Sequence, residues 1–109
     1  NILDKIQNFD ILLSLSHREG LPVSFLESMS QGVPVISYKI RGAKDLIIDN
    51  YNGYLYEKKN IKKILEKIIF LSKNNNILSQ ISNNSYKFID HKFDSTKNAK
   101  IIVKFINNV

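Results

Sequence analysis

Short, uninterrupted apolar runs alternate along this sequence with longer segments of helical spacing, and this alternation limits the possible folds more than any other feature. The continuous runs are typical of strands that are buried on both faces. The predicted strands are 10–16, 33–37 and 54–56. The predicted helices are 2–8, 22–31, 43–48, 60–72, 77–89 and 95–107. Strands that alternate with helices favour a parallel sheet with right-handed crossovers. We therefore predict an α/β fold, a Rossmann-like parallel sheet with flanking helices.

Individual residues mark where several of these elements begin and end. Pro22 suits the first turn of a helix, where its missing N–H is not needed, and Gly32 suits the position just after the end of that helix. Asn60 is expected to cap the helix over 60–72. Asn50 and Gly53 both tolerate positive φ in the turn before the third strand. The inner face of the first of these helices is expected to hold Pro22, Phe25, Leu26 and Met29. The apolar stripe of the helix over 60–72 is expected to be Ile61, Ile64, Leu65, Ile68 and Leu71.

The composition excludes several classes of protein. The chain has no cysteine, which rules out disulfides, thiolate metal sites and a cysteine nucleophile, and its two histidines lie far apart. We therefore expect no metal and no cofactor. The net charge of +6 comes from fourteen lysines and two arginines against ten acidic residues. An arginine-poor chain is not typical of a nucleic-acid surface, so no nucleic-acid partner is expected. No apolar run approaches the length of a membrane span.

The chain is expected to be part of a longer protein. Its 109 residues allow at most one domain, and three strands are few for a sheet that is covered on both faces. The first residue is Asn1 rather than a methionine, and the predicted helix 2–8 begins directly after it. We therefore predict a single partial domain over 1–109 whose first strands lie upstream. The sheet edge left open in this way is expected to favour homo-oligomers.

The loop and helix that follow the first strand carry the residues most suited to binding a ligand. In an open parallel sheet, ligands lie beyond the carboxyl ends of the strands. Glu19 and Glu27 stand on either side of Gly20, which lets a backbone approach closely. The amides near Val23 and Ser24 lie at a helix N-terminus, which attracts anions. A nucleotide-sugar, with its ribose diol, pyrophosphate and sugar hydroxyls, matches this set. Either glutamate taken alone is better explained as a helix-dipole partner or as a solvated side chain.

The sequence around the two glutamates resembles the signature of family-4 glycosyltransferases, the group 1 glycosyl transferases. The matching string is Ser-x-x-Glu-Gly-Leu-Pro over 16–22, followed by Leu-Glu-Ser-Met-Ser-x-Gly-Val-Pro-Val-Ile over 26–36. The resemblance continues at 41–45 and at 49–55, and it covers about half of the chain. It implies retaining enzymes of the two-domain GT-B fold, with this chain as the later part of the C-terminal, donor-binding domain.

The resemblance also implies roles for individual residues. Glu19 matches the family glutamate that lies at the donor sugar and is the expected catalytic residue. Glu27 matches the glutamate that binds the ribose hydroxyls. Gly20, Leu21, Pro22 and Val23 are the remaining expected donor-binding residues. Ser16 matches a small residue with a structural role. Arg41 and Asp45 depart from the family's Gly-Gly-x-x-Glu pattern, Arg41 at the first glycine and Asp45 at the glutamate.

Together these expectations describe a segment of a glycosyltransferase that transfers a sugar from a UDP-sugar to a glycan or lipid-linked acceptor in bacterial surface polysaccharide synthesis. The expected partners are the nucleotide-sugar donor and an N-terminal acceptor domain, and the isolated segment is expected to be inactive. A cytoplasmic location, at the inner face of the membrane or away from it, is expected. Two alternatives stay open, namely a basic module that binds nucleic acid or membrane, and a fragment of a GT-B nucleotide-sugar epimerase. The membrane alternative depends on the lysines of 58–67, which a solvated helix face opposite an apolar stripe explains better.

Overall fold

Three parallel strands form the centre of the fold. The computed structural model describes residues 11–16 and 23–92. Within them β1 (Leu12–Ser14), β2 (Val35–Tyr38) and β3 (Gly53–Tyr56) pair in that order, and every pairing is parallel. The helices are α2 (Val23–Ser30), α3 (Arg41–Leu46), α4 (Ile61–Ser72) and α5 (Asn75–Lys92). The predicted fold class is confirmed. The predicted helices 2–8 and 95–107 lie outside the described residues.

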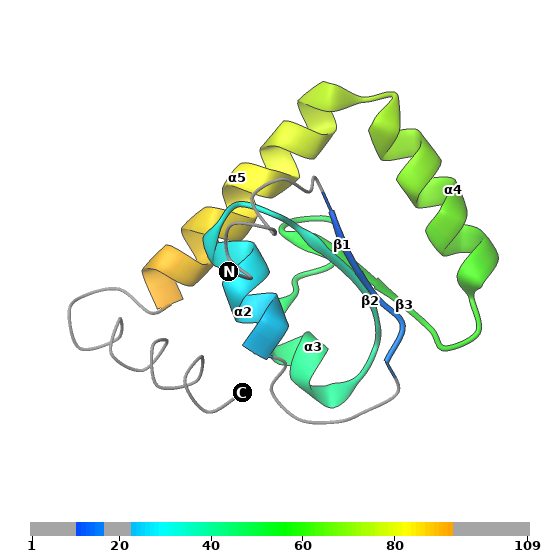
Figure 1. Cartoon of the computed structure of the whole chain (residues 1–109), viewed down its shortest axis with the longest axis horizontal. Coiled ribbons are helices and arrows are strands. Elements are labelled where there is room, and N and C mark those ends of the chain that lie inside the picture. The colour runs from blue at the N-terminus through cyan, green and yellow to red at the C-terminus, as the bar shows by residue number, and fades with distance from the viewer. Residues whose placement is uncertain (1–10, 17–22, 93–109) are drawn as a thin grey trace.

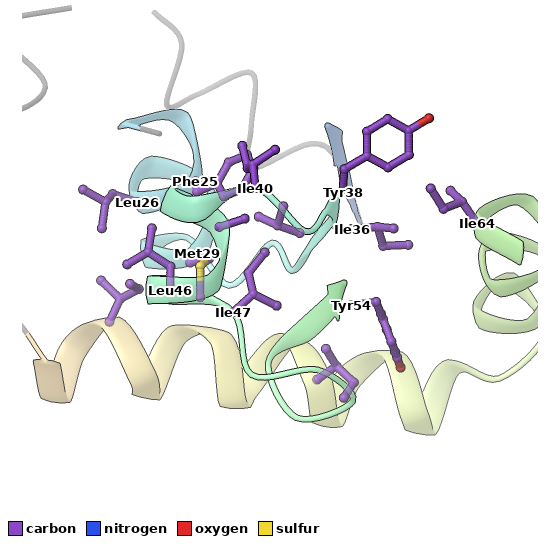
Figure 2. Packing of buried hydrophobic residues seen from close by; sticks show 14 of the residues in the cluster. Phe25, Leu26, Met29, Ile36, Tyr38, Ile40, Leu46, Ile47, Tyr54 and Ile64 are labelled. Carbon is purple, nitrogen blue, oxygen red and sulfur yellow. The ribbon is translucent and has the colours of Figure 1, made fainter. Parts of the chain in front are cut away.

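The sheet lies between α2 and α3 on one side and α4 on the other (Figure 1). Alternate residues of a strand point to opposite faces, and Figure 2 shows Ile36 and Tyr38 directed toward Ile64 of α4. On the other side, Phe25, Leu26 and Met29 of α2 join the buried cluster, as predicted. α5 contacts α2, α4 and β3 and so connects the two layers at one side of the sheet.

The end of α2 follows the predicted glycine signal. Gly32 has φ of 77°, its amide donates to the carbonyl of Met29, and the amide of Val33 donates to the carbonyl of Ser28. These two bonds form the Schellman arrangement that ends a helix in a left-handed residue. The hydroxyl of Ser28 also donates to the carbonyl of Val33 at 2.8 Å. The turn from α2 into β2 is therefore held by main-chain and side-chain bonds together.

Other boundary predictions need correction. Asn60 occupies the position before α4, but its side chain makes no capping hydrogen bond. α5 begins at Asn75 rather than at residue 77, because the carbonyl of Asn74 accepts the amides of Ile77 and Leu78 and starts the helix early. The predicted stripe of α4 is also partly wrong. Ile64 and Leu71 are buried, whereas Ile61 and Leu65 are 41% and 51% exposed.

Gly53 is required for a different reason than the one predicted. Asn50 takes φ of 68° in the turn, as expected, but Gly53 is not among the described residues with positive φ. It begins β3 directly beside β2, and a Cβ at this position would lie 2.5 Å from the carbonyl oxygen of Val35. The glycine therefore allows two strand backbones to approach closely, as glycine in a strand often does.

Replacing Gly53 by alanine should destabilise the fold. The added methyl group must push β2 and β3 apart, and overpacking of this kind costs about 1–3 kcal/mol. Urea unfolding of Gly53→Ala should show this loss in the free energy of unfolding. Asn50→Gly, in the same turn but without a clash, should change it by less than about 1 kcal/mol. Equal stability of Gly53→Ala and the parent sequence would contradict the close approach.

Candidate donor-binding site

The candidate site lies at the sheet edge where β1 and β2 end and α2 and α3 begin. α2 is the best-defined part of it. Its residues 25–29 are all buried, because α2 packs on the sheet with one face and against α5 with another. A helix enclosed in this way leaves little room for a polar side chain to reach solvent.

Glu27 is the predicted site residue whose surroundings the structure describes most fully. Its side chain is buried, with 4% of the residue exposed, and its Oε2 atom has no hydrogen-bond partner among the described residues. A solvated glutamate in the second turn of a helix was the simpler expectation, and the burial shows that this expectation is wrong. Nearly all buried polar atoms in native proteins are paired, so an unpaired carboxylate oxygen requires an explanation.

The surroundings of Glu27 fix its position. The hydroxyl of Ser30 donates to the carbonyl of Glu27 at 2.8 Å, and the hydroxyl of Ser82 on α5 donates to the carbonyl of Gly32 just beyond the helix. With Phe25, Leu26 and Met29 packed in the core, α2 has little freedom to rotate. The backbone that carries Glu27 is therefore held in place by packing and by hydrogen bonds to main-chain carbonyl groups.

The remaining predicted site residues divide into two groups. Val23 is half-buried and is the first residue of α2, so its amide is one of the four that have no partner within the helix. Glu19, Gly20, Leu21 and Pro22 lie outside the described residues, and their roles stay predictions. No cluster of three potential metal ligands occurs in 11–16 and 23–92.

The neighbouring strand ends carry side chains of another kind. Arg41 is exposed and begins α3 where β2 has ended. On β3, burial raises the pKa of the Tyr54 and Tyr56 phenols, and the nearby Asp49 carboxylate raises both further. Both phenols therefore stay protonated at neutral pH. Tyr54 is buried, and the Nζ atom of Lys67 on α4 lies 4.7 Å from its ring centroid, so this tyrosine packs between the sheet and α4.

Asn52 is a buried polar residue whose role the sequence did not reveal. It is completely buried; its Oδ1 accepts the amide of Ile48 at 2.8 Å and its Nδ2 donates to the carbonyl of Leu46 at 3.1 Å. These bonds close the connection from α3 to β3. The residue is paired on both sides, so its role is structural.

Comparison with known proteins agrees with this geometry. Residues 1–88 match the family model of the group 1 glycosyl transferases, and the chain belongs to that family. The poly(glycerol-phosphate) alpha-glucosyltransferase of Bacillus subtilis is 36% identical over 81 residues, which is 73% of this chain and 12% of that protein. The predicted family is therefore confirmed.

Two solved structures share both the fold and part of the sequence. A variant of Staphylococcus aureus TarM, in complex with Fondaparinux, alpha-GlcNAc-glycerol and UDP, has a TM-score of 0.81 and 30% identity over 96% of this chain and 21% of its own. The C-terminal domain of the group 1 family protein LpcC from Francisella tularensis has a TM-score of 0.78 and 30% identity over 85% of this chain and 48% of its own. The chain thus spans between an eighth and a half of the proteins it matches.

The unpaired Glu27 carboxylate should make the ligand-free fold less stable than a variant without this carboxylate. Glu27→Met keeps the length of the side chain and removes a buried charge, so the free energy of unfolding should rise by about 1 kcal/mol or more. Chemical denaturation without nucleotide measures this change. Glu66→Met, at an exposed position of α4, should leave stability within about 0.5 kcal/mol. A large loss in Glu27→Met would instead mean that the carboxylate has a structural partner.

Proposed function

We propose that this chain binds the donor in a retaining glycosyltransferase that uses a UDP-sugar. The observation that carries the proposal is the buried Glu27 carboxylate, which lies on α2, the helix that follows β1, and lacks a partner among the described residues. Ribose hydroxyls are donors, and a carboxylate is an acceptor in a well-defined position. Bonds to an ionised acceptor contribute about 1.5–3 kcal/mol each. A bound nucleoside would therefore supply the partner that Oε2 lacks.

The rest of the donor is proposed to extend from Glu27 toward the N-terminus of α2. The free amides of the first turn, including that of Val23, favour a diphosphate through the helix dipole. Glu19, Gly20, Leu21 and Pro22 precede that turn in sequence, and we propose that Glu19 lies at the sugar as the catalytic residue while the other three contact the sugar and the diphosphate. No step in this proposal requires a metal, because the amides at the N-terminus of α2 would stabilise the leaving diphosphate.

We further propose that residues 1–109 form only part of the donor domain. The face of the sheet under α4 is covered at β3 and β2, where Tyr54 and Ile36 are 3% and 1% exposed, but their neighbour on β1, Leu13, is 41% exposed. A further strand beside β1, with its own helix, would cover Leu13. The solved LpcC domain is about twice as long as the segment that matches this chain, which supports this arrangement. In the isolated chain the same edge is expected to form homo-oligomers.

The acceptor and the location are proposed from the relatives alone. The Bacillus subtilis relative is named for a poly(glycerol-phosphate) acceptor, and we propose a surface polymer or lipid-linked glycan acceptor for the protein that contains this chain. The acceptor would be held by a separate N-terminal domain, and the reaction would take place on the cytoplasmic side.

Titration with UDP tests the donor site in the isolated chain. Amide NMR signals of residues 20–27 should shift more than those of α5. Binding of UDP should be weak, because residues 1–109 are proposed to form only part of the donor domain. Glu27→Met should reduce these shifts, while Glu66→Met should leave them unchanged. Shifts confined to α4 would overturn the proposed site.

Kinetics of the full-length protein should separate the two glutamates. Glu27→Met removes bonds made in both the ground state and the transition state, so the main effect should be a KM for the donor raised by about tenfold or more. Glu19→Ala should mainly lower kcat, because Glu19 is proposed to lie beside the positive charge that develops at the anomeric carbon. Full activity of Glu19→Ala would contradict its role.

The isolated chain should not turn over nucleotide-sugars. Transfer requires donor and acceptor held together, and positioning supplies a large part of the rate enhancement. A radiolabelled UDP-sugar assay with the purified 109-residue chain checks this expectation. Multiple-turnover transfer by this chain would show that the site is complete without another domain.

A further inference from the structure

The outer surface of α4 combines exposed apolar side chains with lysines. Ile61, Leu65, Ile69 and Phe70 are between 41% and 56% exposed, which is unusual for so many large apolar residues on one short helix. Ile64 and Leu71 turn the other side of α4 into the core, which leaves these four outside. Ile61, Leu65 and Ile69 follow one another at intervals of four residues and therefore form one continuous stripe.

The lysines lie on the same helix and on the segment that leads into it. Lys58, Lys59, Lys62, Lys63 and Lys73 are all exposed. Of the acidic residues nearby, Glu57 forms a 3.1 Å ion pair with Lys39 of the adjoining strand end, which leaves Glu66 as the acidic side chain on α4 itself. Lys67 is engaged separately, with its Nζ 4.7 Å from the ring centroid of Tyr54 and 5.1 Å from that of Phe70. The surface therefore has a clear excess of positive charge.

The position of this surface leaves the donor site free. α4 lies across the sheet from α2 and α3, on the outside of the molecule (Figure 1). A ligand that covers α4 would not reach Glu27 or the first turn of α2. No helix in the described part of the chain is both long and apolar enough to cross a membrane, so any membrane contact by these residues has to be peripheral.

We propose that the outer surface of α4 is a docking site for an anionic phospholipid surface. Apolar side chains bordered by lysines match the interface between headgroups and acyl chains, where the apolar residues enter the boundary and the lysine ammonium groups remain at the phosphates. Each lysine near such a surface strengthens binding about fivefold, and the effect decreases with added salt. The surface has no arginine and so lacks the planar, bidentate group that favours phosphate contacts in nucleic acids. This proposal is independent of the donor site.

Tryptophan fluorescence gives a direct test, because the chain contains no tryptophan of its own. Ile69→Trp should show a blue-shifted emission with vesicles of phosphatidylcholine and phosphatidylglycerol, and brominated acyl chains should quench it. Tyr86→Trp, at a position of α5 that is similarly exposed at 48%, should show neither effect. Both substitutions are at exposed positions, so circular dichroism should confirm that the folds are unchanged.

Two pairs of lysine substitutions separate the docking surface from the general charge of the chain. Lys62→Gln with Lys73→Gln should weaken vesicle binding about 25-fold, as expected for two lysines at the membrane. Lys44→Gln with Lys87→Gln, on α3 and α5, gives the same net charge and should weaken binding by less than about threefold. Vesicles of phosphatidylcholine alone should bind weakly.

Three results would contradict docking of α4 on an anionic phospholipid surface. Equal losses in the two lysine pairs would mean that net charge alone attracts the chain to vesicles, and would overturn the proposal. Absence of vesicle binding, or an Ile69→Trp emission that shifts only with protein concentration and not with lipid, would mean that this surface is covered by protein instead. UDP binding should be unchanged in these variants. Failure of the membrane proposal would therefore not count against the proposed donor site.

Discussion

The burial of α2 between the sheet and α5 is the constraint on which the candidate site depends. Five consecutive residues of this eight-residue helix are buried, so the usual division into an inner and an outer face does not apply. Phe25, Leu26 and Met29 supply the apolar contacts, and the hydroxyl of Ser28 donates a hydrogen bond to the carbonyl of Val33. The Oε2 atom of Glu27 has no such partner among residues 11–16 and 23–92. The packing that stabilises the helix therefore places a carboxylate inside the protein, which is a cost to stability that a ligand with hydroxyl groups can offset.

Several features of the fold could be predicted because they depend on local chemistry. Gly32 ends α2 in a left-handed conformation, and the apolar runs form the predicted parallel strands. The resemblance to the group 1 glycosyl transferases was visible in the same residues and is confirmed. These signals are short in sequence range, so a single sequence contains all the information they require.

Features that depend on tertiary packing could not be predicted in the same way. α2 packs against α5, whose residues lie about fifty positions later, and helical spacing within α2 alone placed Glu27 in solvent. The stripe of α4 was assigned too widely, because Ile64 and Leu71 are buried in the core whereas Ile61 and Leu65 remain exposed. The need for Gly53 likewise arises from the neighbouring strand and not from its own φ angle.

The central claim is that the Glu27 carboxylate receives hydrogen bonds from the ribose diol of the donor. A thermodynamic cycle tests it most directly, with UDP and its 2′-deoxy and 3′-deoxy forms titrated into the wild-type chain and Glu27→Met. The account predicts that loss of the hydroxyl weakens binding to the wild type by about tenfold or more, but hardly changes binding to Glu27→Met, since the two changes remove the same interaction. Equal losses in both proteins would show that Glu27 and the ribose do not interact, and would contradict the account.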